Sequence, residues 1–177
     1  MTSDRAVTLA DVRIGGSRIV IEPHNCFACG SLNVHGLHLE LHAGGDRCWT
    51  ELVLDRRFEG WEGIAHGGIL CTILDEVMAW ALVGEDNWGV TARMNVAFRR
   101  PVEVGRTVRA EGWIAQARRR VVDTAARIVD ADTGDELATA TGVYVAASPD
   151  RKRYLRERYA FRPVEATSES PESVDAG

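Results

Sequence analysis

One helical pattern constrains the fold of this chain more than any other feature. Between residues 66 and 83, apolar side chains stand at positions 69, 70, 73, 74, 77, 78 and 81, which is the spacing of a helix with a broad buried face. We expect this helix to begin at His66-Gly67-Gly68 and to stop at Gly84. Such a helix needs other elements to cover it.

The segments on both sides of the helix have the alternating pattern of strands. RIVIEP (18–23), LHLELHA (37–43) and CWTELVL (48–54) precede it, and Gly44-Gly45-Asp46 between the last two predicts a hairpin turn. Four strand-like segments follow it and predict a meander, with breaks at Pro101, Arg119 and Thr133-Gly134; they are residues 90–100, 106–119, 120–131 and 136–147. The pattern predicts an α+β fold in which an antiparallel sheet wraps one long central helix.

The chain length of 177 residues fits one domain with a sizeable core. Residues 1–17 are expected to be a loose N-terminal lead-in, and residues 18–149 the folded domain. Residues 150–177 are expected to be a basic segment, DRKRYLRERYAF, with the character of a short helix, followed by a disordered acidic tail rich in Ser, Glu and Pro.

Charge and hydropathy exclude several classes of partner. A net charge of -5 argues against non-specific nucleic-acid binding, which needs a basic face. The first residues lack a signal-peptide core, and no run approaches the roughly 20 apolar residues of a membrane span. We therefore expect a cytoplasmic protein whose four cysteines, Cys26, Cys29, Cys48 and Cys71, are reduced thiols.

Asp75 is an unusual residue for an apolar helix. Its neighbours Ile73, Leu74, Val77 and Met78 are apolar, and a buried carboxylate costs free energy unless it is paired or used. The alternative is that Asp75 or Glu76 points to solvent from a partly exposed side. One of the two carboxylates must lie nearer the buried face.

Gly67 and Gly68 at the helix start leave backbone N–H groups unobstructed, next to the positive end of the helix dipole. Such a terminus can hold a carbonyl oxygen as it becomes an oxyanion. Taken alone, the glycines favour a simpler role in a tight turn and close packing. Gly67 and Asp75 are separated by roughly 12 Å along one helix, so a site that uses both must be shared between two antiparallel helices of a symmetric dimer.

The motif resembles a known family. His66-Gly67-Gly68 with an aspartate nine residues after the histidine, followed by GVTARMNVAFRRPVEVG, is similar to the hotdog-fold acyl-CoA thioesterases of the phenylacetate-pathway and thioesterase-superfamily-member type. The segment CFACGSLNVHGL also looks like the N-terminal signature of one subgroup, so the resemblance covers about residues 25 to 147. It implies a hotdog fold, an acyl-CoA substrate, no cofactor, and a homodimer or a dimer of dimers.

The resemblance also implies roles for individual residues. Asp75 would attack the thioester or activate a water, two chemistries that the sequence does not separate. The Gly67 N–H would polarise the thioester carbonyl, with Gly68 beside the substrate. His66 would brace the turn, and Thr91 would help to position the water.

Further residues are candidates for substrate binding. Many relatives carry Asn or Gln in the loop before the histidine, but FEGWEGIA has neither, so Glu62 or Asn33 is the expected replacement. Trp61 is expected to line an acyl pocket. Arg99 and Arg100 are expected to meet coenzyme A phosphates, although a solvated basic face is the more frequent role of such a cluster.

Three other interpretations stay open. A hydratase or dehydratase would need a histidine near residues 56 to 58, where the chain has Arg56-Arg57-Phe58. A non-catalytic acyl-CoA-binding protein is the second. The third is a zinc site of Cys26, Cys29, His35 and His38, but its spacings depart from those of zinc fingers. Packing cysteines are favoured, and no metal is predicted.

Overall fold

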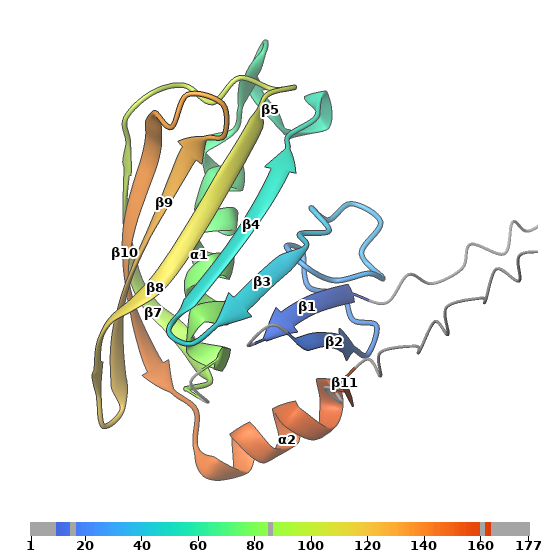
Figure 1. The fold of residues 1–177 in the computed structure, drawn as a ribbon, viewed down its shortest axis with the longest axis vertical. Coiled ribbons are helices and arrows are strands. Elements are labelled where there is room, and N and C mark those ends of the chain that lie inside the picture. The colour runs from blue at the N-terminus through green and yellow to red at the C-terminus, as the bar shows by residue number, and fades with distance from the viewer. Residues whose placement is uncertain (1–9, 15–16, 85–86, 160–161, 164–177) are drawn as a thin grey trace, which may run out of the picture.

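The computed structural model describes residues 10–14, 17–84, 87–159 and 162–163. A nine-stranded sheet curves around the long helix α1 (Gly67–Gly84), as Figure 1 shows. The other elements are β1 (Ala10–Ile14), β2 (Ser17–Ile21), β3 (Leu41–Gly44), β4 (Arg47–Val53), the 3-10 helix Arg56–Phe58, β5 (Glu59–Trp61), β6 (Ile64–Ala65), β7 (Gly89–Phe98), β8 (Thr107–Arg118), β9 (Val121–Asp130), β10 (Glu136–Ala146), α2 (Pro149–Tyr159) and β11 (Arg162–Pro163). The predicted α+β architecture is confirmed.

The strand order differs from the predicted four-strand meander. The sheet runs β11-β2-β1-β3-β4-β8-β9-β10-β7, so β8, β9 and β10 form a meander while β7 lies beside β10 at the edge. The chain from β7 to β8 is too long for a tight hairpin. In this connection, the backbone N–H groups of Arg99 and Arg100 both donate to the Leu137 carbonyl, at 2.8 and 3.1 Å. Glu103 forms an isolated antiparallel β-bridge with Ile64.

The N-terminal part of the sheet also differs in detail. The expected loose lead-in contains strand β1, which pairs antiparallel with β2 and parallel with β3. The strand expected over residues 37–43 begins only at Leu41. The N–H groups of Leu37 and Leu39 donate instead to the carbonyls of Phe27 and Ala28, both at 2.9 Å, so this stretch pairs with the preceding loop. The hairpin between β3 and β4 is confirmed, with Gly45 at φ 56 in its turn.

The apolar stripe of α1 packs into the concave face of the sheet. Ile73, Leu74, Val77 and Met78 are all 0% exposed. The closest approach of helix to sheet is at Gly112 of β8, where an added Cβ would lie 2.6 Å from the backbone of Val77. Among the described residues, no helix is long and apolar enough to cross a membrane.

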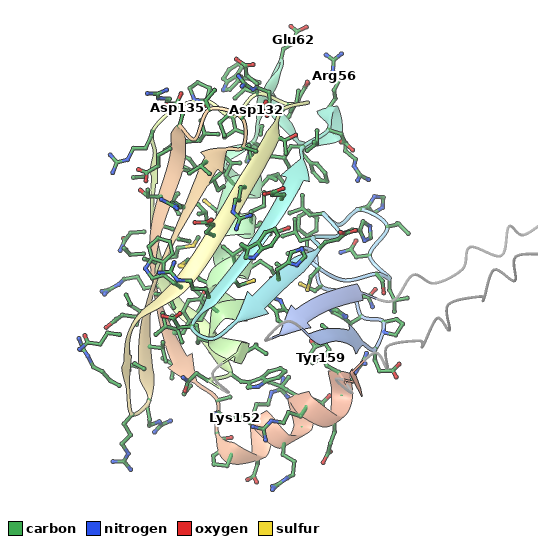
Figure 2. All side chains as sticks on the ribbon, in the orientation of Figure 1. Arg56, Glu62, Asp132, Asp135, Lys152 and Tyr159 are labelled. Carbon is green, nitrogen blue, oxygen red and sulfur yellow. The ribbon has the colours of Figure 1, made fainter. Side chains whose placement is uncertain are left out.

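Helix α2, in orange, lies below the sheet in Figure 1 and matches the helical character expected of the basic segment. It has no buried residues, and the Glu22 N–H donates to the carbonyl of its last residue, Tyr159, at 3.0 Å. Figure 2 shows Lys152 and Tyr159 at this end of the molecule, with Arg56 and Glu62 at the other end. The predicted acidic tail beyond residue 163 lies outside the described residues.

The contact between Gly112 and Val77 predicts a large cost for one extra methyl group. Gly112→Ala forces α1 away from β8, so we expect the free energy of unfolding to fall by about 1–3 kcal/mol. Chemical denaturation measures this change. Ala115→Val, on an exposed position of the same strand, is the control and should change stability by less than about 0.5 kcal/mol. Equal effects of the two substitutions would contradict the close packing of helix and strand.

Candidate active site

His66 precedes α1 and fixes its first turn. The His66 N–H donates to the Phe58 carbonyl at 2.8 Å, and its own carbonyl accepts from the Ile69 N–H at 2.9 Å. The ring nitrogen Nδ1 accepts the Gly68 N–H at 2.9 Å. The imidazole thus satisfies one of the backbone donors that a helix start leaves without a partner.

The two glycines after His66 lie close to neighbouring side chains. A Cβ on Gly68 would lie 3.0 Å from His66 Nδ1, and a Cβ on Gly67 would lie 3.3 Å from the Phe98 ring. Gly67 lines an open hollow of about 330 Å³ together with Phe98, Arg99 and Arg100. In the described part of the chain the Gly67 N–H has no hydrogen-bond partner, so the positive end of the helix dipole carries an available donor.

Asp75 is held by two hydroxyl groups from the neighbouring strands. Thr91 Oγ1 of β7 donates to Asp75 Oδ1 at 2.8 Å, and Tyr144 Oη of β10 donates to the same oxygen at 2.7 Å. The Tyr144 hydroxyl also lies 3.0 Å from the Asp75 carbonyl oxygen. No hydrogen bond to Oδ2 is found among the described residues. One carboxylate oxygen is therefore anchored, and the other is available for chemistry.

Tyr144 is a site residue that the sequence analysis missed. Its side chain is 0% exposed, and burial together with the Asp75 carboxylate raises the pKa of its phenol above the usual range. The phenol therefore stays protonated and acts as a donor. The signal in the sequence is weak: a tyrosine on the inward face of a strand needs a partner for its hydroxyl, but the pattern does not identify that partner.

The remaining candidates lie at several places in the chain. Trp61 is 83% exposed and Glu62 lies beside it at the tip between β5 and β6, where Figure 2 shows Glu62 pointing away from the sheet. Asn33 braces its own loop, since its Oδ1 accepts the His35 N–H at 3.1 Å. No hydrogen bond joins these three residues to Asp75 in the described structure.

The two arginines lie nearer the helix start. Arg99 and Arg100 share the hollow with Gly67, and Arg100 is paired with Asp135 at 2.6 Å. Within one chain, the candidates therefore form separate groups: Asp75 with Thr91, and Gly67 with the arginines.

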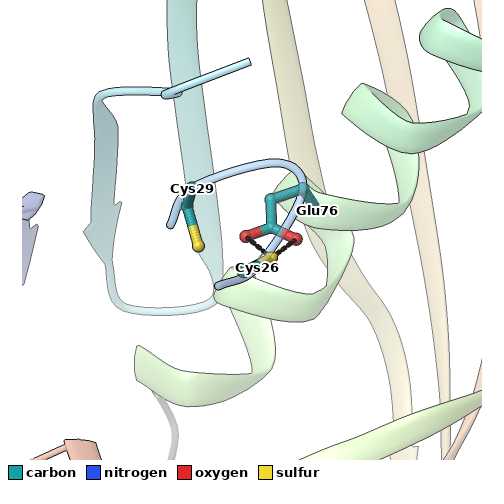
Figure 3. Close-up of side chains that lie close together, drawn as sticks. All are labelled: Cys26, Cys29 and Glu76. Carbon is teal, nitrogen blue, oxygen red and sulfur yellow. Dashed lines mark hydrogen bonds between the residues drawn. The ribbon is translucent and has the colours of Figure 1, made fainter. Parts of the chain in front are cut away.

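A second polar cluster lies around Glu76, which leaves α1 on a different side from Asp75. Figure 3 shows the Glu76 carboxylate against Cys26, with Cys29 beside them. A hydrogen bond from the Cys29 thiol lowers the pKa of Cys26 to about 5, and the same bond with burial raises the pKa of Cys29 above its usual range. Burial and the adjacent Cys26 raise the pKa of Glu76 to about 7. The histidines considered for zinc, His35 and His38, are exposed and outside this cluster.

A curved sheet around one helix, with His-Gly-Gly at the helix start, defines a hotdog-fold protein. Residues 62–137 match the family model of the thioesterase superfamily, which confirms the resemblance inferred from the sequence. No match is found among curated proteins.

Solved structures agree on the fold. Zebrafish thioesterase superfamily member 2 is similar with a TM-score of 0.59 at 16% identity, over 62% of this chain and 81% of that one. The PaaI protein from the phenylacetic acid degradation operon of E. coli gives 0.55 at 18% identity, over 57% and 76%. A hypothetical thioesterase from Streptococcus pneumoniae, solved with coenzyme A, gives 0.56 at 16%, over 58% and 80%. Two further structures of the pneumococcal protein carry alanine in place of an aspartate and of a threonine sixteen positions later.

The contact of the His66 ring with the Gly68 N–H predicts a capping role. His66→Ala should lower the free energy of unfolding by about 1 kcal/mol, because the first turn of α1 loses its side-chain acceptor. His66→Asn supplies another acceptor and should recover most of that loss. Thermal or chemical unfolding measures both, with the exposed His35→Ala as control. A His66→Asn variant as unstable as His66→Ala would argue against capping.

Proposed function

We propose that this protein hydrolyses acyl-CoA thioesters to a free acid and coenzyme A, at a site shared across a homodimer. The observation that carries the proposal is the hydrogen bonding of the Asp75 carboxylate. Thr91 and Tyr144 both donate to Oδ1, and Oδ2 accepts no hydrogen bond from the described residues. A carboxylate positioned in this way can act as a nucleophile or as a general base. The match of residues 62–137 to the thioesterase superfamily supports this chemistry.

The free edge of the sheet supports a dimer that completes the site. β7 is a ten-residue edge strand with Val90 and Phe98 largely exposed, and an unpaired edge of this length favours pairing with another chain. Thr91 at one end of β7 contacts Asp75, and Phe98 at the other end lies against Gly67. Antiparallel pairing of β7 with its copy, centred near Met94 and Asn95, brings the Thr91 end of one strand to the Phe98 end of the other. Asp75 then faces the helix start of the partner subunit.

In this arrangement the Gly67 N–H holds the thioester carbonyl oxygen as charge develops on it. Asp75 Oδ2 either takes a proton from a water that attacks the carbonyl carbon, or attacks that carbon itself and forms an anhydride that water then opens. In both routes the carbon–sulfur bond breaks, and the coenzyme A thiolate leaves and takes up a proton. The Tyr144 and Thr91 hydroxyls keep Asp75 in position during these steps.

The hollow beside Gly67 supports binding of the coenzyme A portion. Arg99 and Arg100 line it, and guanidinium groups bind phosphates with paired hydrogen bonds. Coenzyme A in the similar pneumococcal structure supports this substrate class. The aspartate and threonine replaced in that protein have the same sixteen-residue separation as Asp75 and Thr91. The four free cysteines fit the reducing cytoplasm that we infer as its location.

A non-catalytic acyl-CoA-binding protein is the second candidate. Its support is the loop before His66, which lacks an amide side chain and carries Trp61 at 83% exposure. Pairing into a dimer of dimers is compatible with either function. Hydration of an enoyl-CoA is the less favoured third activity.

The anchored state of Asp75 predicts the first functional test. Release of free thiol from a panel of short, long and aromatic acyl-CoAs should depend on Asp75 and fall at least a thousandfold in Asp75→Asn, since the amide neither attacks nor accepts the proton. Tyr144→Phe and Thr91→Val each remove one donor to Oδ1, so about a tenfold loss of kcat is expected for each.

The control is Asp123→Asn, a carboxylate on β9 that pairs with Arg118 rather than with Asp75. It should leave thiol release unchanged. Tight acyl-CoA binding by calorimetry without Asp75-dependent turnover would instead select the non-catalytic function.

Sharing of the site between subunits predicts complementation. Gly67→Pro deletes the N–H at the first helical position, where proline is tolerated, and Gly67→Ala is its matched control because it keeps the N–H. Homodimers of Gly67→Pro and of Asp75→Asn should both be inactive. A mixed dimer of the two should regain about half of the wild-type activity, since one of its two sites is intact. Inactive mixed dimers would show that each site belongs to one chain.

A further inference from the structure

The cluster on the Glu76 side of α1 has the donor set of a metal site. Cys26 Sγ, Cys29 Sγ and a Glu76 carboxylate oxygen all lie within 4.8 Å of one another. Cys26 Sγ is 3.8 and 3.9 Å from the two Glu76 oxygens, and His24 Nε2 is 3.4 Å from Cys29 Sγ. Ligand atoms around a tetrahedral zinc, with bonds of about 2.0–2.3 Å, are roughly 3.4–3.8 Å apart. The spacings among Cys26, Cys29 and Glu76 therefore suit this ion with small adjustments, and the His24 ring, which contacts Cys29, would shift toward the other two donors to complete the set.

Groups outside the cluster orient two of these donors. The Nδ1–H of His24 donates to the Glu22 carbonyl at 3.1 Å, and this contact directs Nε2 at Cys29. The Trp80 indole N–H donates to Glu76 Oε1 at 2.9 Å. Metal-binding histidines and carboxylates in proteins have outer hydrogen bonds of this kind.

The loop backbone presents both sulfurs together. The sequence Cys26-Phe-Ala-Cys29-Gly30 closes on itself, with the Gly30 N–H donating to the Cys26 carbonyl at 2.9 Å. A Cβ on Gly30 would lie 2.4 Å from both the Cys26 nitrogen and the His24 carbonyl oxygen, so this tight turn requires glycine. Backbone N–H groups of Ala28 and Cys29 interact with the Cys26 sulfur and favour its thiolate form.

The pocket beside the cluster is lined largely by apolar side chains. The cluster borders a pocket of about 170 Å³ whose described lining contains no Lys or Arg, while its apolar members include Ala79, Val83 and Trp88. Sulfur and carboxylate donors gathered among apolar side chains are stabilised when a cation binds them.

We propose that Cys26, Cys29, His24 and Glu76 bind a structural zinc ion. The two sulfurs favour zinc over the hard cations calcium and magnesium, and four protein ligands leave no open position for catalysis. The ion links the loop around Cys26 to α1. It also supports α2, because the His24 ring packs edge-on against Tyr159 with centroids 5.1 Å apart. The site is separate from Asp75 chemistry and does not rest on the proposed hydrolysis.

Metal content is the first measurement. The full-length protein, purified without chelators and analysed by mass spectrometry of its metals, should carry about one zinc per chain. Cys26→Ser/Cys29→Ser should carry less than a tenth of that amount, and Glu76→Gln and His24→Gln should weaken zinc binding at least tenfold. Cys71→Ser, a cysteine on α1 outside the cluster, is the matched control and should keep its zinc.

Two measurements use the wild-type chain, so they test zinc binding even if a variant fails to fold. A chelator should lower the melting temperature, and added zinc should restore it. Replacement of zinc by cobalt should give the absorption bands of a tetrahedral thiolate site. A reduced protein that takes up neither ion, or zinc content unchanged in the Cys26→Ser/Cys29→Ser variant, overturns the proposal. So does a Cys26–Cys29 disulfide with no metal uptake after reduction. None of these outcomes depends on thioester hydrolysis.

Discussion

The structure depends on the close fit of one helix inside a curved sheet. At Gly112 and Gly142 the strands leave no room for a side chain, since a Cβ would lie 2.6 Å from the Val77 backbone and 2.6 Å from Thr124 Oγ1. The apolar stripe of α1 is buried against this concave face. Its two consecutive carboxylates cannot enter that stripe, and they leave the helix on its two flanks, where each finds polar partners.

The two flanks offer different chemistry. Hydroxyl groups from β7 and β10 donate to one oxygen of Asp75 and leave its other oxygen free. Sulfur, imidazole and indole groups surround Glu76, in a pocket where burial raises its pKa to about 7. Hydroxyl groups can position the Asp75 carboxylate by hydrogen bonds without neutralising it by an opposite charge. The thiol and imidazole groups near Glu76 can instead bind a metal ion together with its carboxylate. Neighbouring acids on one helix therefore have separate roles.

The sequence predicted the architecture because periodicity determines it: the helix, the hairpin of β3 and β4, and the strands after α1 were found to within a few residues. The position of β7 beside β10 was not predictable, because local patterns do not specify which edge a strand joins. Tyr144 and His24 were missed for the same reason. Their partners, Asp75 and Cys29, are recognisable only once the fold brings the elements together.

The contacts of Glu76 also bear on Asp75. Successive residues on a helix are turned by about 100°, so whatever fixes the direction of Glu76 fixes the direction of Asp75 as well. Trp80 binds Glu76 from the next turn, and Cys26 approaches it from the N-terminal loop, 50 residues earlier in the sequence. On the other flank, Thr91 and Tyr144 bind Asp75 from β7 and β10. Contacts on both sides oppose rotation of the helix about its axis, and this keeps Asp75 Oδ1 within reach of the two hydroxyl groups that bind it.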